Sequence, residues 1–438
     1  MEPSELRELT ATKLQRITWL SSRDQSKCFN NLMHLFNGES LEDCYRELAR
    51  NKAPGIDQVS KEEYGKQLIA NLDELVNKLK RMSYRPGHLR EVKIPKEGRP
   101  GAVRALAISN FEDKLIQKMM HKVLESIYEP TFLDCSYGFR PGRGCHDAVR
   151  ALRHYLYENE VETIIDVDLA NYFGTIKREI LLEILSKRIA DKKLLRYIVR
   201  LLKSGILSEG ELKVTEEGVC QGSACSPILA NIFAHYVIDK WFQGVVKRSC
   251  LGKVELFRYA DDIIICCRYA SDAKRIRKAL VGRLMKYGLK LNEDKTRMVN
   301  FSKKSYETGA KPEGFDFLGF TLYWGRSRSG RAIPKLKSSG KRLRVKLKRV
   351  NLWAKKIRDV CKLKDIWKLF CLKLAGHIRY FGVSFNTQGV KRFVCEAVRI
   401  LFRWLNRRSQ KKSFTWEEFM LFMNNYPVPK ARIWHKLY

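Results

Sequence analysis

The spacing of apolar residues predicts that the chain begins with helices, followed by a hairpin. Residues 1–85 carry apolar side chains at intervals of three and four, as from Leu68 to Leu79, which is typical of amphipathic helices. Arg90 to Pro95 alternates polar and apolar positions, and Val103 to Ile108 can return beside it, so we expect a basic hairpin. Helical spacing resumes over residues 111–130.

From residue 161 onward, short apolar runs alternate with helical segments. The expected strands are 162–167, two short ones within 206–215, 254–259, 263–268, 296–301 and 315–323. The expected helices are 177–205, 226–245 and 271–287, and beyond residue 333 we expect helices to the end of the chain. This alternation predicts class α+β, with an antiparallel sheet that is backed by helices.

Positive charge is concentrated toward the carboxyl end. The 438 residues include 84 Lys and Arg against 48 Asp and Glu, a formal net charge of +36, and residues 331–438 hold 28 of the former against 5 of the latter. Such a field opposes compaction unless a polyanion neutralises it, and nucleic acid is the usual polyanion. The alternative is a solvated charged helix, although the segment lacks the interleaved acids that self-pairing would need.

Composition excludes several classes of protein. Apolar residues make up 45% of the chain, which excludes a disordered polymer, and no run approaches the ~18–20 consecutive apolar residues of a membrane helix. The amino terminus lacks the pattern of a secretory signal or a transit peptide. The 12 cysteines include no C-x2-C pair, so we expect free thiols. These observations predict a cytoplasmic protein without a membrane partner.

Acidic residues follow two of the expected strands. Asp261 and Asp262 separate the two apolar runs of an expected hairpin, and Asp166 and Asp168 end the strand that begins at residue 162. Paired aspartates are commonplace at turns, so turn chemistry alone is the alternative. If the two strand ends lie side by side, three or four carboxylates gather, and their mutual repulsion is tolerable only with bound cations.

These carboxylates predict a metal-dependent reaction. Oxygen ligands without nearby histidine or cysteine suit Mg²⁺, which keeps waters and binds substrate phosphates. Two such ions about 4 Å apart can activate a 3′-hydroxyl and stabilise a departing pyrophosphate, which is nucleotidyl transfer. Alternation places Asp166 and Asp168 on one face of the strand, so spacing alone leaves open which of them is the ligand.

Motifs along nearly the whole chain resemble those of group II intron reverse transcriptases, also called maturases. Tyr259-Ala-Asp-Asp262 resembles the catalytic motif of reverse transcriptases, and Asp168-Leu-Ala-Asn-Tyr-Phe173 resembles their first metal-binding motif. The remaining motifs follow in family order, and they are Lys52–Asp57, Arg90–Lys96, Tyr137–Gly142, Gln221–Asn231, Gly288–Thr296 and Phe317–Phe320.

The resemblance implies a right-hand polymerase with fingers, a palm that holds the antiparallel sheet, and an all-helical thumb that is also the maturase domain. The implied domains are 1–85 (an N-terminal extension and the start of the fingers), 86–160 (fingers, with strands that join the palm), 161–330 (palm with the catalytic site) and 331–438 (thumb). The chain ends at Tyr438, so we expect no appended DNA-binding or endonuclease domain.

The same resemblance assigns roles to individual residues. The implied catalytic residues are Asp168, Asp261 and Asp262, which would hold two Mg²⁺ ions, or Mn²⁺ as a substitute, with the main-chain carbonyl of Leu169. Asp166 lies off the motif and becomes a minor candidate. The implied nucleotide-binding residues are Lys96, Arg104, Phe173, Gln221, Gly222 and Lys295. The implied primer and template contacts are Tyr259, Phe317, Leu318 and Gly319.

Several of these roles have a physical basis. The bulk of Phe173 would exclude a 2′-hydroxyl and so favour dNTPs, the alternative being a core phenylalanine. An ammonium and a guanidinium, from Lys96 and Arg104, suit a triphosphate. Lys295 would lie beside the site, or it is a surface charge. The implied RNA contacts of the thumb are Lys341, Arg342 and Arg344 on its first helix, and Arg403, Arg407 and Arg408 near its end.

Four positions depart from the family pattern. Cys220 stands where a proline usually precedes the glutamine, and Ala105 stands where the family reads Arg-Pro-Leu. Asn171 and Gly174 replace a common glycine and aspartate. None of these changes removes an implied metal ligand, so they bear on fidelity and finger geometry rather than on the chemistry.

The sequence therefore predicts an RNA-directed DNA polymerase that uses dNTPs and a primer on an RNA or DNA template. It would also bind structured group II intron RNA and assist its splicing and mobility. The alternatives are a domesticated enzyme in DNA repair or phage defence, and a non-enzymatic RNA-binding splicing cofactor. The cognate RNA, the priming mode and the formation of a homodimer are left open by the sequence.

Overall fold

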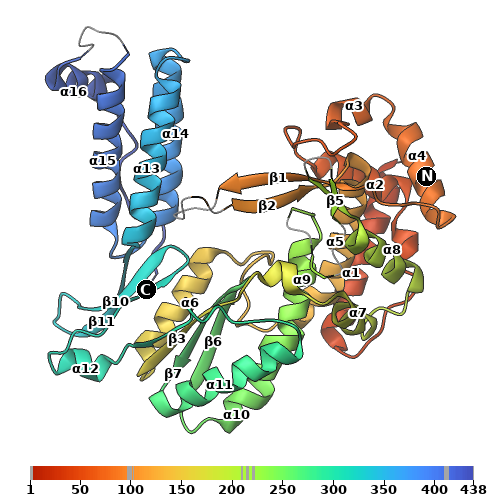
Figure 1. The fold of residues 1–438 in the computed structure, drawn as a ribbon, viewed down its shortest axis with the longest axis horizontal. Helices are drawn as coiled ribbons and strands as arrows, with labels where there is room; N and C mark the ends of the chain where they lie inside the picture. The colour runs from red at the N-terminus through yellow and green to blue at the C-terminus, as the bar shows by residue number, and fades with distance from the viewer. Residues whose placement is uncertain are drawn as a thin grey trace.

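The computed structural model describes residues 3–95, 101, 103–208, 211–213, 217–219, 222–408 and 414–437. Within these residues the chain is mixed α and β, with three sheets and a group of helices toward the carboxyl end (Figure 1). None of the helices in these ranges is long and apolar enough to cross a membrane.

The amino-terminal part is helical, as its apolar spacing predicts. Its central helix is α5 (Phe111–Tyr128), against which α1 and α2 pack. Asn37 caps α2, because its side chain accepts a hydrogen bond from the backbone N–H of Ser40 at 2.9 Å. The helices of this part, besides α5, are α1 (Pro3–Arg23), α2 (Gly38–Glu47), α3 (Lys61–Gly65) and α4 (Leu68–Lys80), with the 3-10 turns η1 (Met33–Leu35) and η2 (Glu129–Thr131).

The predicted basic hairpin is present and belongs to a small mixed sheet. β1 (Leu89–Pro95) and β2 (Val103–Ile108) pair antiparallel, and β1 also pairs parallel with β4 (Ile206–Ser208), which pairs with β5 (Glu211–Lys213). The strand order is β2-β1-β4-β5. In Figure 1 this hairpin extends from the amino-terminal helices toward the carboxyl-terminal helices.

The central sheet is fully antiparallel. Its strands are β3 (Thr163–Asp168), β6 (Val254–Tyr259), β7 (Asp262–Cys267) and β8 (Arg297–Asn300), in the order β6-β7-β3-β8. Both faces of the sheet are covered. Ile164 packs into a core with α6 (Cys145–Glu158), whereas Ile165 packs into a core with α11 (Ala270–Lys286). Burial on both faces explains why β7 is apolar at consecutive positions rather than at every second one.

Between the strands of the central sheet the chain forms further helices. They are η3 (Tyr172–Thr175), α7 (Arg178–Ser186), α8 (Lys192–Lys203), α9 (Ser226–Ala234) and α10 (Lys247–Ser249). Of these, α8 bonds to the amino-terminal part through Tyr197 and Arg200. Two π-helical segments, His235–Asp239 and Phe242–Val246, continue α9. A short helix, α12 (Lys303–Glu307), precedes the third sheet.

The third sheet joins the central sheet to the carboxyl-terminal helices. β9 (Phe315–Phe317), β10 (Phe320–Arg326) and β11 (Ala332–Ser338) pair antiparallel in the order β11-β10-β9. The helices that follow are α13 (Gly340–Ile357), α14 (Leu363–Phe381), α15 (Thr387–Leu405) and α16 (Trp416–Asn425). Figure 1 shows α13, α14 and α15 side by side, standing away from the central sheet.

Three sequence predictions are wrong in detail. The helix expected over 177–205 is two helices, because Asp191 accepts hydrogen bonds from the backbone N–H groups of Lys193 and Leu194 and starts α8 anew. The strand expected over 315–323 is two strands around a tight turn. The chain beyond 333 is not helical throughout, since β11 pairs along the whole of β10 and residues 426–437 contain no helix.

Candidate active site

Strand register brings the predicted carboxylates together. β3 and β7 pair antiparallel so that Asp168 is the Cα partner of Asp262. Asp262 also begins β7 opposite Tyr259 of β6, which leaves Ala260 and Asp261 as the two residues of the hairpin turn. Ala260 has a left-handed φ of 57°, which is unusual for a residue other than glycine. The two acidic strand ends therefore lie side by side.

A cavity of about 1000 Å³ opens in front of these carboxylates. Its walls come from the hairpin β1–β2, the segment that follows β3, the turn between β6 and β7, and helix α13. The predicted site residues among its lining are Arg104, Asp168, Leu169, Phe173, Asp261, Asp262, Lys295 and Arg342.

Burial and crowding make the carboxyl groups of the turn hard to ionise. Burial raises the pKa of Asp262 to about 6, and the neighbouring charge of Asp261 adds to this effect, while Arg342 opposes it. Burial also raises the pKa of Asp261, against which Arg104 and Lys295 act. Both carboxylates therefore lie in a region that favours an additional positive charge.

Asp168 is positioned by the segment that precedes β8. Lys295 Nζ lies 3.0 Å from each carboxylate oxygen of Asp168. The backbone N–H of Asp168 donates to Thr296 Oγ1 at 3.2 Å, and the N–H of Asn292 donates to the Asp168 carbonyl at 2.8 Å. Thr296 is a positioning residue that sequence reasoning did not single out, although it closes the motif that begins at Gly288.

Asp166 has a different environment from Asp168. It forms an ion pair with Arg297, whose Nη2 lies 3.1 Å from Asp166 Oδ2, and it does not line the cavity. Burial raises the pKa of Asp166, and the bond from Arg297 opposes that shift. Tertiary pairing thus separates two aspartates that strand alternation could not tell apart.

Phe173 lies at the cavity wall because the segment after β3 is anchored on both sides. Asn171 adopts a left-handed φ of 47°, and the buried Tyr172 donates its hydroxyl to the carbonyl of Ala230 at 2.6 Å. The backbone N–H of Val219 donates to the Phe173 carbonyl at 2.8 Å. The Phe173 ring is partly buried and contacts the Tyr172 ring edge to face.

Of the remaining residues predicted to bind the nucleotide, some line the cavity and others do not. Arg104 lines the cavity from β2, next to Ala105. Gly222 has a φ of 115°, and an added Cβ would collide with the carbonyl of Ala107 on β2, so its immediate neighbour is the protein's own backbone. Lys96, Gln221 and Cys220 lie outside the described residues.

The predicted primer contacts form a tight turn between β9 and β10. Phe317 is buried and pairs with Phe320, while Leu318 and Gly319 have φ values of 49° and 84°. The hydroxyl of Tyr380 on α14 donates to the Leu318 carbonyl at 2.8 Å, so a carboxyl-terminal helix supports this turn. Tyr259 belongs to another turn, since it ends β6 in the hairpin that carries Asp261 and Asp262.

The predicted RNA contacts divide into two groups. Arg342 lines the cavity, and so does Arg349, seven residues further along α13. An interval of seven places two side chains on one helix face, and this signal could have identified Arg349. The second group does not line the cavity. In it, Arg403 is exposed, Arg407 lies over the Trp404 ring at 5.1 Å, and Arg408 donates to the Cys361 carbonyl at 3.0 Å. Lys341 and Arg344 are exposed.

The donor set fits a divalent cation that brings some of its own ligands. In the described part of the chain, no three His, Cys, Asp or Glu side chains are gathered closely enough to enclose a metal ion. Mg²⁺ nevertheless needs only one or two carboxylates when waters and substrate phosphates complete its coordination. Asp168 and Asp262, which are register partners, and the adjacent Asp261 offer such a partial set.

Comparison with known proteins agrees with this geometry. Residues 94–322, which include both acidic strand ends, match the family described as reverse transcriptase (RNA-dependent DNA polymerase). This chain belongs to the reverse transcriptase family.

Its relatives include proteins encoded by group II introns. The chain is 30% identical to protein YkfC of Escherichia coli over 347 residues, 72% of this chain and 88% of the relative. It is 30% identical over 233 residues to the group II intron-encoded protein LtrA of Lactococcus lactis, 53% of this chain and 38% of that protein. An uncharacterized 91 kDa protein in a cob intron of Schizosaccharomyces pombe is 33% identical over 287 residues, 61% of this chain and 34% of that protein.

Proposed function

We propose that this member of the reverse transcriptase family is an active RNA-directed DNA polymerase. The observation that supports this most is the register of β3 and β7, which pairs Asp168 with Asp262 at the wall of a large cavity. In the proposed reaction a primer 3′-hydroxyl attacks the α-phosphate of a dNTP, and pyrophosphate departs.

The proposed right-hand architecture assigns each part of the fold a task. The hairpin β1–β2 and the amino-terminal helices would be the fingers, the sheet β6-β7-β3-β8 the palm, and helices α13 to α16 the thumb. The boundary between palm and thumb that the sequence suggested, at 330, lies in the turn between β10 and β11. Because these two strands pair along their length, we place the boundary after β11 instead.

The proposed chemistry uses divalent cations held by Asp168, Asp261 and Asp262, with the carbonyl of Leu169 nearby. When bound, two Mg²⁺ ions, or Mn²⁺ in their place, activate the 3′-hydroxyl and stabilise the leaving group. Lys295 neutralises Asp168 in the absence of a cation, since its ammonium lies 3.0 Å from both carboxylate oxygens. Once a cation binds Asp168, the ammonium of Lys295 would be released to bind a phosphate.

Cations on three sides of the cavity would hold the nucleotide and the primer. Arg104 from the proposed fingers and Lys295 from the palm suit the triphosphate, since each offers charge-assisted hydrogen bonds to phosphate oxygens. Phe173 would exclude a 2′-hydroxyl by contact with C2′ of the sugar. Arg342 and Arg349 would reach phosphates from the thumb, because both line the same cavity.

We further propose that the carboxyl-terminal helices bind structured intron RNA and promote its splicing. The names of LtrA and of the Schizosaccharomyces pombe relative both refer to an intron. Residues 331–438 hold 28 Lys and Arg against 5 Asp and Glu. Binding of RNA by such a surface releases condensed counterions, which gives affinity without sequence readout. Sequencing the RNA that copurifies with the protein separates an intron partner from a role in repair or defence.

Substitution of one turn aspartate tests the polymerase. Asp261→Ala should abolish dNTP incorporation on a primed RNA template with Mg²⁺, while RNA affinity stays within a few-fold of wild type. Asp166→Asn is the matched control, because this neighbouring aspartate pairs with Arg297 and does not line the cavity. Synthesis by Asp261→Ala at the wild-type rate would show that the proposed metal site is wrong. Absence of synthesis by the wild-type protein, with RNA binding retained, would favour the non-enzymatic cofactor.

A further inference from the structure

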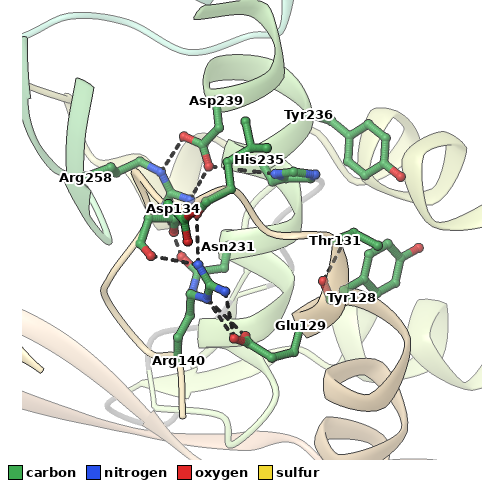
Figure 2. Close-up of polar contacts among 12 residues, drawn as sticks. Tyr128, Glu129, Thr131, Asp134, Arg140, Asn231, His235, Tyr236, Asp239 and Arg258 are labelled. Carbon is green, nitrogen blue, oxygen red and sulfur yellow. Dashed lines mark hydrogen bonds and ion pairs between the residues drawn. The ribbon is translucent and has the colours of Figure 1, made fainter. Parts of the chain in front are cut away.

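A fully buried arginine lies directly behind the catalytic turn. Arg258 immediately precedes Tyr259 in β6, and its side chain has no exposed surface. Its guanidinium is surrounded by residues from three segments: the loop that contains Ser136, helix α9 with its π-helical continuation, and the turn itself. Figure 2 shows Arg258 with Asn231 and Asp239 of the second segment. A charged group is not buried in this way without partners, because desolvation disfavours its charge.

The partners account for all five N–H donors of the guanidinium. Nε and Nη2 donate to the two carboxylate oxygens of Asp239 at 2.8 and 2.6 Å. Nη2 also donates to Ser136 Oγ at 2.7 Å, and Nη1 donates to Asn231 Oδ1 at 2.9 Å. The remaining Nη1 donor reaches the carbonyl of Ala260 at 3.2 Å. A planar fork with five donors can satisfy this arrangement, whereas an ammonium cannot.

The bond to Ala260 links this network to the catalytic aspartates. Ala260 is the turn residue that adopts a left-handed φ of 57°, and it lies next to Asp261 and Asp262. Left-handed backbone is unfavourable for alanine and persists where the surroundings hold it. The hydrogen bond from Arg258 is such a support, since it binds the carbonyl of the strained residue itself.

The partners of Arg258 are held in turn by other elements. Asn231 donates from Nδ2 to the carbonyl of Gly138 at 2.6 Å, and Ser136 lies on a segment that exchanges backbone hydrogen bonds with Arg258. Asn231 and Asp239 are eight residues apart, a spacing that drifts by about 80° around a regular α-helix. The π-helical turn at His235–Asp239 holds more residues per turn and so reduces this drift.

Asp239 has Arg258 as its neutralising partner. His235 Nδ1 lies 3.9 Å from Asp239 Oδ2, a contact drawn as a dashed line in Figure 2, but burial lowers the pKa of its imidazole to about 3. His235 is therefore neutral at physiological pH. The Arg258 guanidinium is the charged group that contacts Asp239 in this network.

We propose that Arg258 is a positioning residue for catalysis. Held by Asp239, Asn231 and Ser136, it fixes the Ala260 carbonyl and so sets the direction in which Asp261 and Asp262 face Asp168. This inference rests on the proposed polymerase function. It adds a residue that touches neither substrate nor metal and acts through the backbone of the turn.

The test compares two buried arginines of the same region. Arg258→Lys keeps a positive charge near Asp239 but cannot make all five bonds. Arg140→Lys is the matched control, because the Arg140 side chain is only 5% exposed and pairs with Glu129 at 2.8 Å (Figure 2). Its other bonds go to the main-chain carbonyls of Leu133 and Ser136, and within the described residues none goes to the turn. Both variants should lower the thermal midpoint of unfolding. Only Arg258→Lys should lower kcat, by about ten-fold or more, with the KM for dNTP within about three-fold, as expected for misplaced reacting groups.

A direct readout of the carboxylates accompanies the kinetics. Mn²⁺ binding, followed by electron paramagnetic resonance, should weaken in Arg258→Lys and stay unchanged in Arg140→Lys. If Arg258→Lys does not fold, the double variant Arg258→Gln with Asp239→Asn replaces the ion pair by neutral amides and avoids an unpaired buried charge. It should fold and still show the loss of kcat and of Mn²⁺ affinity.

Several outcomes would overturn the inference. A folded Arg258 variant with wild-type kcat and Mn²⁺ affinity would do so, and so would equal losses in the Arg140 control. Failure of the polymerase proposal looks different, because wild-type protein would then not extend a primer at all. In that case the Mn²⁺ measurement would still decide whether Arg258 positions the carboxylates.

Discussion

The loop that contains Gly138 offers a steric test of how the proposed catalytic turn, Ala260 and Asp261, is held. A Cβ added at residue 138 would lie 2.5 Å from the backbone nitrogen of Ala260 and 3.0 Å from the carbonyl carbon of Tyr259. Non-bonded heavy atoms prefer separations of about 3.5 Å, so Gly138→Ala requires a displacement of roughly 1 Å between the loop and the turn. Both colliding atoms belong to the backbone, so a side-chain rotation cannot relieve the contact.

The expected effect on catalysis exceeds the effect on stability. Overpacking of this kind costs about 1–3 kcal/mol of the free energy of unfolding, which leaves most of the protein folded. A displacement of about 1 Å in the groups that hold the reacting atoms can lower the rate about 100-fold. We therefore expect Gly138→Ala to lose about two orders of magnitude in kcat for primer extension.

The assay is steady-state primer extension on an RNA template, with the folded fraction measured by thermal unfolding. Gly282→Ala is the control, because Gly282 lies in α11 and an added Cβ there meets no atom within 4 Å. This change should stabilise the helix by about 0.5–1 kcal/mol and leave kcat unaltered. A folded Gly138→Ala protein with wild-type kcat would refute the reasoning that loop and turn are in rigid contact.

Three further predictions concern selectivity, RNA binding and the core. Phe173→Ala should raise incorporation of rNTPs relative to dNTPs, measured as the ratio of kcat/KM values for the two substrates. Lys341→Gln with Arg344→Gln should lower the slope of log affinity for RNA against log salt by about 1–2, because two exposed cations are lost. Phe370→Ala should cost about 3–5 kcal/mol in denaturant unfolding, since the Phe370 ring is buried in α14.

Each of these predictions has an outcome that contradicts it. Unchanged sugar selectivity would make Phe173 a core residue, and an unchanged salt slope would remove Lys341 and Arg344 from the RNA surface. For the core, Leu372→Ala on the same helix is the control, because Leu372 is 61% exposed and should cost less than about 0.5 kcal/mol. Equal losses at Phe370 and Leu372 would show that the packing of α14 is misassigned.

Local pattern sufficed to locate the secondary structure of the site. The strand expected over 162–167 is β3 at Thr163–Asp168, and the strands expected over 254–259 and 263–268 are β6 and β7 within one residue. These segments are predictable because alternation and apolar runs report whether a side chain is buried, which is a property of a few neighbouring residues. The break within 177–205 was missed because it depends on Asp191, which also accepts backbone hydrogen bonds from Leu32 and Met33, far away in the chain.

Contacts between distant segments decided which residues form the site. Strand alternation could not separate Asp166 from Asp168, whereas pairing with β8 gives Asp166 an arginine, and the segment that precedes β8 gives Asp168 a lysine. Arg342 and Arg344 look equivalent on a basic helix, yet of these two Arg342 lines the cavity. Arg258 reads in the sequence as a strand residue, and its partners Ser136 and Asp239 lie 122 and 19 positions away.

The sequence by itself determined the class of fold, the acidic strand ends and the excess of charge at the carboxyl end, because each is written in residues close together along the chain. The tertiary structure decided which strands are neighbours, which cations face the carboxylates and what supports the turn that carries Asp261. These depend on partners brought together only when the chain packs, and periodicity records that a side chain is buried without recording what it is buried against.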